Sequence, residues 1–439
     1  MGRKIAVIGG GSGYAAGIVN TLAQPGDEFA GAEVVLMDLP VGKAHQDTIL
    51  RLGKHLAEVH GADISYRATL DLDDALTGAD FVITCFRIGG REALNLDVSI
   101  PMKYDIYGDE TAGPGGIFFA LRSIPVMVDI AKRMERLCPK AYLINYANPT
   151  AFIADAVRRE TDIEELSLCN GYLGVGLLAE QFLGYPAKEV VAFTAGVNHF
   201  TWTLRAMLGE KDITQELVEA LKAEKTEDKP WRWQLVIEIV RRYGIQPSPG
   251  SHMVDYLFRR EVLQHQKAEG HWGLAAQDKT GERSPEVWKH YEELIRSEKP
   301  EFDMTIPGMR HLVGTVSDMA VAVIASIIGD RREIMAVNLP NVGQVGNLGR
   351  GEIVESPAVI GAFGAAPIAV GDIPEKVLPI TEILTHARKL TVDAALTGDR
   401  ERLLDALMSD PLVDSVNKAK PMMEEMLKAQ AKWLPQFAG

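Results

Sequence analysis

The sequence predicts an α/β protein in which a doubly wound parallel sheet is followed by a second, helix-rich α+β part. Three observations support this fold class. Short apolar runs of strand length alternate with helix-length segments through about the first 190 residues. A glycine-rich turn follows the first of these runs, at residues 9–13. From residue 213 onward, long stretches with helical periodicity replace the alternation.

The elements of the first part follow from the length and composition of each run. The expected strands are short, almost wholly apolar and bounded by turn residues, as is typical of strands buried on both faces. They lie at residues 5–8, 33–37, 81–85, 141–145 and 166–168. Helices are expected at residues 14–23 and 44–60. This order favours a parallel sheet with helices on both faces.

The second part is predicted to be dominated by helices. Residues 213–243 and 376–432 are rich in Glu, Lys, Leu and Ala at helical spacing. Strand-like pieces recur at 334–338 and 352–355. We therefore place a first domain at residues 1–195 and a second domain at residues 196–439.

The overall composition is that of a soluble globular enzyme, with 46% apolar and 24% charged residues. A net charge of −14 disfavours nucleic acid or an anionic membrane surface as a partner. No basic and apolar leader opens the chain, and its apolar runs are too short or too broken to span a bilayer. The three cysteines, an odd and sparse set, do not suggest a disulfide framework. We expect a cytoplasmic protein.

The glycine-rich turn predicts a dinucleotide site in the first domain. In Gly9-Gly10-Gly11-Ser12-Gly13, backbone N–H groups at a helix N-terminus favour a pyrophosphate. Asp38, at the end of the second strand, can accept hydrogen bonds from a ribose diol, which favours NAD over NADP. The fingerprint is imperfect, because Tyr14 occupies the third glycine position. The competing interpretation is a plain tight turn between a strand and a helix.

Cys169 and His199 are a candidate metal-binding pair, since thiolate and imidazole suit a divalent transition metal. Cys169 precedes the turn residues Asn170-Gly171 at the end of an expected strand, where sites of α/β proteins usually lie. Both residues have an alternative interpretation as ordinary core side chains.

Polar residues in neighbouring loops are candidates for substrate binding. Asn148, before Pro149, ends a strand at the same sheet edge, and its amide suits a sugar hydroxyl. Arg87, Arg91, Asp109 and Glu110 lie among glycines, which indicates a loop that closes over something polar. The alternatives are a residue that only shapes the turn at Asn148 and a solvated surface loop for the other four.

Taken together, these segments resemble the NAD- and metal-dependent family 4 glycoside hydrolases, which are related to lactate and malate dehydrogenases. The resemblance runs through most of the chain. Its carriers are residues 9–12, 86–91, 100–104, 109–116 (DETAGPGG), 144–149, 168–171 (LCNG), 196–199 (GVNH), 337–343 and 347–348.

The resemblance implies glycoside hydrolysis by oxidation and elimination rather than by two carboxylates. NAD would take a hydride from C3 of the glycone, a base would remove the C2 proton, the C1–O bond would break by elimination, and water would add before C3 is reduced again. A divalent metal ion, Mn²⁺ above others, would assist. Arg87 is expected at the cofactor, and Arg91, Asn148 and Asn170 at the substrate. A homodimer or homotetramer is expected.

The chain departs from the family where the base is expected. Many relatives carry an Asp-Arg-His run there, whereas this chain has Ser251-His252. Tyr243, His252, Asp255 and Tyr256 all remain candidates, and a histidine suits proton abstraction near neutral pH.

The sequence also leaves alternatives for the residue that protonates the leaving group and for the sugar that is recognised. Asn170 follows the metal cysteine and cannot act as a general acid, so Asp109 or His252 are candidate proton donors. The glycone is neutral, 6-phosphorylated or acidic. Two other functions remain: an NAD-dependent dehydrogenase of a sugar acid or hydroxy acid, and a nucleotide-binding sensor without catalysis.

Overall fold

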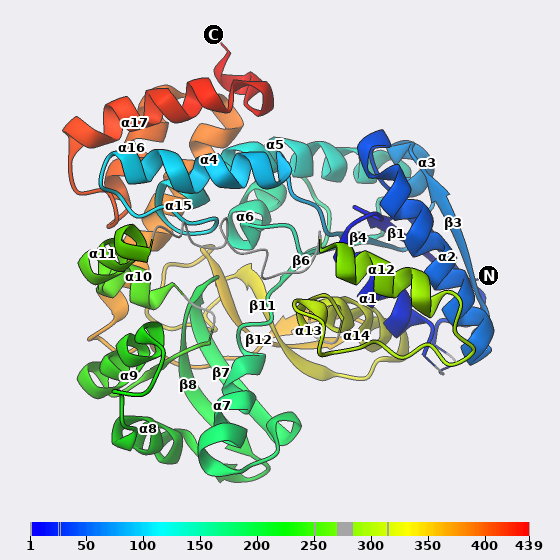
Figure 1. Ribbon diagram of the computed structural model, residues 1–439, viewed down its shortest axis with the longest axis horizontal. Coiled ribbons are helices and arrows are strands. Elements are labelled where there is room, and N and C mark those ends of the chain that lie inside the picture. The colour runs from blue at the N-terminus through cyan, green and yellow to red at the C-terminus, as the bar shows by residue number, and fades with distance from the viewer. Residues whose placement is uncertain are drawn as a thin grey trace.

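The computed structural model describes residues 2–24, 26, 28–249, 252–269, 284–313 and 316–438. Within them one 13-stranded mixed sheet runs through the molecule, and helices cover it (Figure 1). The strand order is β10-β8-β7-β12-β11-β6-β5-β4-β1-β2-β3, with β13 paired to β12 and β9 to β8. The strands are β1 (Lys4–Ile8), β2 (Ala32–Met37), β3 (Ile64–Thr69), β4 (Phe81–Thr84), β5 (Tyr142–Asn145), β6 (Glu165–Leu168), β7 (Val190–Val197), β8 (Phe200–Leu208), β9 (Lys211–Asp212), β10 (Gln246–Pro247), β11 (Glu333–Pro340), β12 (Ile353–Gly361) and β13 (Gly364–Pro367).

The α-helices alternate with the strands in the first half and dominate the end of the chain. They are α1 (Gly13–Leu22), α2 (Lys43–His60), α3 (Leu72–Leu76), α4 (Gly90–Lys103), α5 (Gly113–Leu137), α6 (Thr150–Glu160), α7 (Leu173–Leu183), α8 (Thr214–Ala223), α9 (Trp231–Tyr243), α10 (Met253–Leu257), α11 (Arg259–Glu269), α12 (Pro285–Leu294), α13 (Met309–Leu312), α14 (Val316–Gly329), α15 (Leu378–Thr397), α16 (Arg400–Ser409) and α17 (Val416–Ala429).

The parallel half of the sheet confirms the predicted fold class. Strands β3-β2-β1-β4-β5-β6 are neighbours in this order, and all their pairings are parallel. This is the strand order of doubly wound dinucleotide-binding folds. The edge strand β3 was not predicted from the sequence, because its residues are mostly half-exposed and do not form an apolar run.

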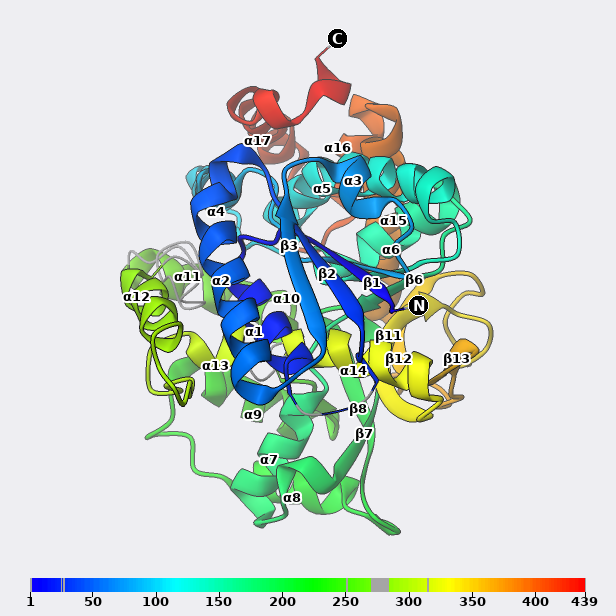
Figure 2. The same cartoon turned by 90° about the vertical axis from the view of Figure 1, so that its right-hand side faces the viewer.

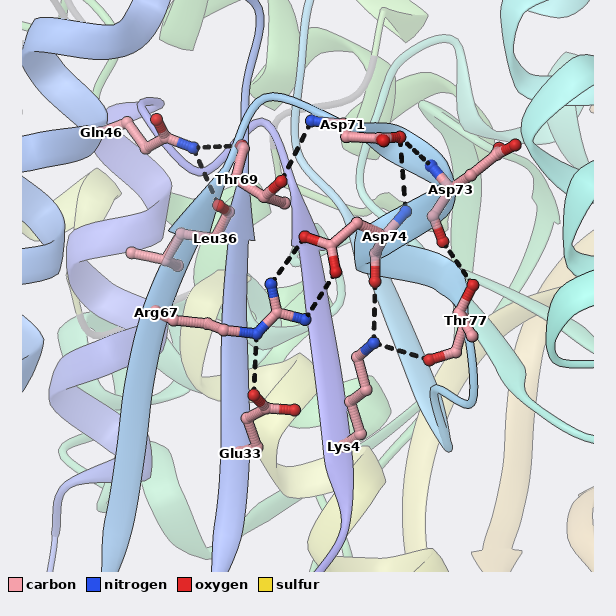
Figure 3. Close-up of polar contacts among 10 residues, drawn as sticks. All are labelled: Lys4, Glu33, Leu36, Gln46, Arg67, Thr69, Asp71, Asp73, Asp74 and Thr77. Carbon is pink, nitrogen blue, oxygen red and sulfur yellow. Dashed lines mark hydrogen bonds and ion pairs between the residues drawn. The ribbon is translucent and has the colours of Figure 1, made fainter.

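Polar contacts fix the β2–β3 edge beside the predicted ribose-binding residue (Figure 3). Gln46 of α2 donates hydrogen bonds to the carbonyls of Leu36 and Thr69, both at 2.8 Å, and so ties the ends of β2 and β3 together. Arg67 of β3 contacts Glu33 of β2 at 2.8 Å. The Gln46 contacts hold the end of β2, from which the chain continues into Asp38.

Two apolar layers cover the parallel half. Figure 2 shows α1 and α2 on one side of β1–β3, and α3, α5 and α6 on the other. Of the helices described, α5 has the length and hydropathy of a membrane span, but 83% of its 18-residue window is buried inside the molecule. It therefore packs as a core helix here.

The sheet continues beyond β6 with antiparallel strands. β11 pairs with β6, β12 with β11, and β7 with β12, so two strands from late in the chain lie between β6 and β7. β7 crosses the boundary that we placed at residue 195, and the sheet is continuous there. The hairpin β7–β8 was not predicted. The division into two domains stays a prediction.

The two long helical stretches are each interrupted. Between α8 and α9 lie residues 224–230, which end in Pro230. Gly398, with φ +71°, ends α15, and Asp410-Pro411 follow α16. A left-handed glycine ends α15, Pro230 stands directly before α9, and Pro411 follows α16. Because the apolar periodicity continues on either side of these residues, it did not reveal the breaks by itself.

Candidate functional site

A cavity of about 1500 Å³ opens along the carboxyl edge of the parallel strands. Residues from the glycine-rich turn line it together with residues that follow β2, β4, β5, β6 and β7. The carboxyl edge of such a sheet is where ligands bind in this fold class. The cavity brings together most of the predicted site residues.

The nucleotide end is shaped by backbone. Gly9, with φ +97°, lies so close to the carbonyl of Cys85 that a Cβ would come within 2.6 Å of its oxygen. A Cβ on Gly11 would come within 2.8 Å of Asp38 Oδ2, which accepts a 2.6 Å hydrogen bond from the N–H of Gly11. Ser12 caps the start of α1. Larger residues at these two glycines would fill the turn.

Some of the predicted cofactor residues line the cavity, and the others position the glycine-rich turn. Gly9, Gly11, Ser12 and Asp38 line the cavity. Gly10 lies against Leu36 and donates its N–H to the carbonyl of Met37 at 2.8 Å. Gly13 is the first residue of α1. The first group can touch a ligand, and the last two position the turn.

Arg87 and Arg91 extend this wall from the end of β4 into α4. The Arg87 guanidinium forms an ion pair with Glu110 and lies 4.6 Å from the centroid of the Phe119 ring. Arg91 lies in the first turn of α4. The structure therefore brings Glu110 and both arginines onto one cavity.

Cys169 and His199 both line the cavity. Cys169 directly follows β6, and His199 lies in the two-residue turn between β7 and β8, where its φ of +61° is unusual for a residue with a side chain. The strained turn points to a functional constraint on His199.

Burial and neighbouring charge perturb both residues. Burial, with the nearby Glu355 carboxyl, raises the pKa of the Cys169 thiol to about 12. Burial and the nearby His252 lower the pKa of His199 to about 4. A neutral imidazole is a metal ligand as it stands, whereas a thiol needs a cation to hold its ionised form.

A chain of hydrogen bonds joins His199 to His252 through Thr111. The Thr111 hydroxyl lies 2.9 Å from His199 Nδ1 and 2.6 Å from His252 Nε2. His252 Nδ1 lies 2.6 Å from Asp255 Oδ2. If Nδ1 is the donor in both rings, His199 donates to Thr111, Thr111 donates to His252, and His252 donates to Asp255. In this pattern neither Nε2 carries a proton.

Asp255 orients His252 and is itself held by an arginine. Arg232 contacts both oxygens of Asp255 at 2.8 Å. Burial alone would raise the pKa of Asp255, but His252 and Arg232 hold it at about 2. Burial would lower the pKa of His252, yet the hydrogen bond to Asp255 and the charge of Asp109 raise it. Asp255 therefore stays ionised beside a basic imidazole.

Asp109 lies within the same group. Ligand atoms of Asp109, His252 and Asp255 lie within 4.8 Å of one another, and all three side chains are buried. The Tyr107 hydroxyl donates to Asp109 Oδ2 at 2.7 Å. Burial raises the pKa of Asp109. Asp109 lines the cavity, so a proton held there would be accessible to a ligand.

Of the two tyrosine candidates for the base, Tyr256 lines a small pocket together with His199 and His252. The Tyr256 hydroxyl accepts the N–H of Gly113 at 3.0 Å and donates to Asp410 at 3.1 Å. Tyr243, the last residue of α9, packs near Trp202 with ring centroids 6.4 Å apart. Among the described residues, neither tyrosine lines the large cavity, and Ser251 lies outside the described residues.

The two predicted substrate amides face the cavity. Asn148 Oδ1 is buried and has no hydrogen-bond partner among the described residues, and the bond to Pro149 is cis. Asn170 lines the cavity, and its carbonyl accepts the N–H of Leu173 at 3.0 Å. An unpartnered buried amide oxygen is suited to a ligand hydroxyl.

Three supporting residues were missed by the sequence reasoning. Thr111 lies inside the DETAGPGG run but was given no role. Arg232 carries no sequence signal. Glu355, on β12, accepts a 2.6 Å hydrogen bond from Asn198 Nδ2 beside the His199 turn, and burial raises its pKa to about 7. Its strand alone gives no hint of this contact.

Comparisons with known proteins show to which family the chain belongs. Residues 4–184 match the family model described as "Family 4 glycosyl hydrolase", and residues 194–413 match "Family 4 glycosyl hydrolase C-terminal domain". The chain is 33% identical to the probable 6-phospho-beta-glucosidase of Bacillus subtilis (strain 168), over 99% of this chain and 98% of that protein.

Solved structures agree on the fold. A 6-phospho-alpha-glucosidase from gut microorganisms, solved in complex with NAD and Mn²⁺, superposes with a TM-score of 0.87 at 22% identity, covering 99% of this chain and 100% of that one. A lactate dehydrogenase from a Medee basin deep-sea metagenome library superposes with a TM-score of 0.53 at 14% identity, covering 90% and 100%. The chain belongs to the family 4 glycosyl hydrolases.

Proposed function

We propose that this hydrolase cleaves a small glycoside by an NAD-dependent oxidation and elimination, with a divalent metal ion at Cys169 and His199 and with His252 as the base at C2. One observation carries the proposal. The cavity that is lined by the glycine-rich turn and Asp38 is also lined by His199, Thr111 and His252, and Asp255 orients His252 from behind.

The residues at the nucleotide end fit NAD. Gly9 and Gly11 leave a cradle that a Cβ would fill, and Asp38 offers a carboxylate at the end of β2. The related 6-phospho-alpha-glucosidase holds NAD. Bound NAD supplies a hydride acceptor. The N-terminus of α1, which follows the turn, favours the pyrophosphate, and Asp38 accepts from the ribose.

The donor set at Cys169 and His199 fits a divalent metal ion such as the Mn²⁺ of that relative. A ligating histidine usually donates its other ring N–H to a partner, and Thr111 is that partner for His199. Such an ion withdraws charge from neighbouring sugar oxygens. The Asp109–His252–Asp255 group fits less well, because Arg232 already places a positive charge on Asp255.

His252 is the base that the geometry favours over Tyr243, Asp255 and Tyr256. Asp255 accepts from Nδ1, so Nε2 is the basic atom, while Arg232 keeps Asp255 ionised. The Nε2 lone pair accepts the Thr111 hydroxyl in this structure and has to exchange that hydrogen bond for the C2 proton. The C2 proton passes to Nε2, the electron pair of the C2–H bond forms the C1–C2 double bond, and the leaving-group oxygen departs from C1. Asn148 Oδ1 accepts a sugar hydroxyl and orients the ring.

The glycone proposed here is a 6-phosphoglucose in β-linkage. The Bacillus subtilis relative carries the name of a 6-phospho-beta-glucosidase, and Arg87 and Arg91 offer guanidinium groups on the cavity wall. Asn170 supplies no proton to a poor leaving group, so activated aryl and β-linked glycosides should react faster than unactivated α-glycosides.

A stripped-enzyme assay tests the function. Protein freed of nucleotide is incubated in D₂O with aryl glycosides, neutral or 6-phosphorylated and of both anomers, with and without NAD⁺ and Mn²⁺. We expect cleavage only with both additions, deuterium at C2 of the product and no net NADH. Stoichiometric NADH without cleavage would show a dehydrogenase instead, and full activity without NAD⁺ would overturn the mechanism.

A second comparison tests the roles given to Asn170 and to the phosphate. In Asn170→Asp, hydrolysis of unactivated α-glycosides should rise relative to activated ones, because an acid then protonates the leaving oxygen. Equal rates in the wild type with no gain in the variant would place the proton donor elsewhere, at Asp109 or His252. Faster turnover of neutral glycosides than of 6-phosphorylated ones would refute the proposed glycone.

The cytoplasmic location and the homodimer or homotetramer remain part of this proposal. Light scattering on the purified protein measures the oligomer directly.

A further inference from the structure

A segment from late in the chain lies against the loop that carries the two cavity arginines. Residues 430–433 follow α17, which packs beside α4 (Figure 1). Arg87 and Arg91, which line the cavity, lie between the end of β4 and the first turn of α4. We call residues 430–433 the brace and residues 87–91 the arginine loop. The structure describes all four brace residues, and none of them lines the large cavity.

We propose that Gln430 and Trp433 of the brace are positioning residues, which hold the arginine loop in place for a phosphate group bound in the cavity without touching that group themselves. The phosphate belongs either to the pyrophosphate of NAD or to the 6-phosphate of the glycone. This inference rests on the proposed function, which gives Arg87 and Arg91 an anionic ligand but leaves open what keeps them on the cavity wall.

Gln430 reaches the arginine loop through a buried guanidinium. Gln430, Asp97 and Arg122 are each no more than 1% exposed. Arg122 of α5 contacts the two oxygens of Asp97 at 2.9 and 2.6 Å and also contacts Gln430 Oε1, while Gln430 Nε2 donates to Asp97 at 3.0 Å. Arg122 Nε donates to the carbonyl of Ile88 at 3.4 Å. Gln430 therefore completes a network that binds the backbone of the loop.

The same guanidinium supports Arg87 through an aromatic ring. Arg122 and Arg87 both lie over Phe119, with their guanidinium carbons 5.4 and 4.6 Å from the ring centroid. Only 1% of Phe119 is exposed, so its ring cannot move without repacking its neighbours. Arg87 also forms an ion pair with Glu110. A displacement of Arg122 would therefore shift the ring against which the Arg87 guanidinium lies.

Trp433 supports the loop by direct contact. Gly89, in the middle of the loop, has a φ of +81°, and a Cβ placed there would lie 3.2 Å from the Trp433 ring. Gly89 is also the N-cap of α4, so the ring packs against the start of the helix that carries Arg91. The neighbouring ion pair between Lys432 and Glu92 is exposed and adds little, because exposed pairs are worth little.

Direct titration tests the positioning without turnover. NAD is titrated into the purified protein, and glucose 6-phosphate into the NAD-loaded protein, by calorimetry. In Trp433→Ala and in Gln430→Met, affinity for the phosphate ligand of the arginine loop should fall about five- to tenfold, which lies within the usual coupling between residues in contact. Trp433→Phe should keep most of the affinity, because a ring still covers Gly89. Affinity for Mn²⁺ should equal that of the wild type.

The pattern of losses identifies the phosphate. A loss for glucose 6-phosphate alone assigns the loop to the sugar phosphate, and a loss for NAD alone assigns it to the pyrophosphate. Either result, or a loss for both ligands, supports the positioning role. Affinities within twofold of the wild type for both ligands in the folded variants would overturn it. An equal loss of Mn²⁺ affinity would overturn it as well, because the whole site would then be loosened.

A double substitution tests the route through Arg87. If Gln430 acts by holding this guanidinium, the addition of Gln430→Met to Arg87→Ala should weaken the affinity by less than about twofold further, because residues that act on one contact are not additive. Losses that multiply in the double variant would place the effect of Gln430 elsewhere and would overturn the route.

Glu425→Ala is the matched control. Glu425 also joins α17 to α4, through contacts with Lys103 and, at 2.8 Å, with the Tyr104 hydroxyl, but these lie at the end of α4 far from the arginine loop. The control should keep all affinities of the wild type. A loss as large as in the brace variants would show that any loosening of α17 weakens binding, which would overturn the specific role of Gln430 and Trp433.

The titrations separate this inference from the proposed function. Losses in the brace variants support the positioning role even if the protein cleaves no glycoside, in which case only the proposed function fails. Losses in Arg87→Ala and Arg91→Ala without losses in the brace variants would overturn the positioning role alone. Losses in the brace variants without losses in the arginine variants would also overturn it, because the brace would then act on another part of the cavity.

Discussion

The two ends of the cavity are built in different ways. The nucleotide end is built mainly from backbone. The turn after β1 and the carboxylate of Asp38 after β2 lie side by side because β1 and β2 are paired, and the N–H of Gly11 donates to Asp38. The histidine end is assembled from side chains that follow β6, β7 and β10 and from a loop before α5. Its contacts join residues 88 and 141 positions apart.

Because of this difference, the two ends of the cavity should tolerate different substitutions. A backbone site depends on glycine at a few positions and on the helix that follows. A side-chain site depends on every partner in the chain from His199 to Arg232, because removing one leaves another buried group without its hydrogen bond. Substitutions should therefore affect the two ends independently, and the predictions below test that independence.

The largest effect is expected at the proposed metal pair, Cys169 and His199. Cys169→Ser and His199→Ala should each lower activity by more than about 100-fold, since removal of a mere supporting partner of a metal ligand already costs 10–100-fold. Calorimetric titration should show NAD binding close to that of the wild type. Cys138→Ala, a buried cysteine away from the cavity, is the matched control and should retain activity. If these variants also lost NAD affinity, they would be misfolded, and the two ends of the cavity would not be independent.

The next effect is expected at the base. His252→Ala should lower the rate by about 100- to 10,000-fold, the range that a positioned general base contributes. Exchange of the C2 proton with D₂O should fall with it. Tyr243→Phe and Tyr256→Phe should each cost less than about tenfold if His252 is the base. A tyrosine variant that abolishes C2 exchange while His252→Ala retains it would assign the base to that tyrosine.

A smaller effect is expected at the nucleotide end. Asp38→Ala should weaken NAD binding by about 1.5–3 kcal/mol, the value of hydrogen bonds to a charged group. Affinity for Mn²⁺, measured separately, should not change. Asp47→Ala, which removes an exposed partner of Lys43 on α2, serves as the control. Unchanged NAD affinity in Asp38→Ala would show that this carboxylate does not hold the ribose.

The smallest effect concerns stability on β6, the strand that joins the parallel and antiparallel parts. Burial raises the pKa of Glu165 to about 7 although Arg158 opposes the shift. The folded protein therefore holds a proton that the unfolded chain releases at lower pH, so stability falls as pH rises toward 7. Glu165→Gln should flatten the change of Tm between pH 5 and pH 8, whereas Glu160→Gln, on the surface of α6, should not. If the change of Tm with pH in Glu165→Gln equalled that of the wild type, the raised pKa of Glu165 would be contradicted.

The same contrast explains what the sequence could reveal. The parallel strands, the glycine-rich turn and the place of Asp38 at the end of β2 follow from local patterns, because each is encoded by adjacent residues. Cys169 and His199 were found through their local turns and the family resemblance. Cys169 was expected at the end of a strand, and both residues line one cavity.

The supporting contacts could not be predicted in this way. Thr111 bridges two histidines that lie far along the chain, and Arg232 meets Asp255 across a helix and a loop. Glu355 reaches Asn198 because β12 lies opposite β7, with Glu355 paired to Gly196. Such partners depend on tertiary pairing, for which no residue spacing gives a signal.

The position of β11 and β12 also determines when the site can form during synthesis. Thirty residues separate Cys169 from His199 in the chain, but in the sheet these two late strands lie between β6 and β7. A ribosome that has translated through residue 168 has made all six parallel strands, although helices from after residue 285 complete both apolar layers that cover them. The frame between the thiol and the imidazole is complete only after residue 361. A chain that terminates earlier would carry Cys169 but would lack the frame that sets it across the sheet from His199.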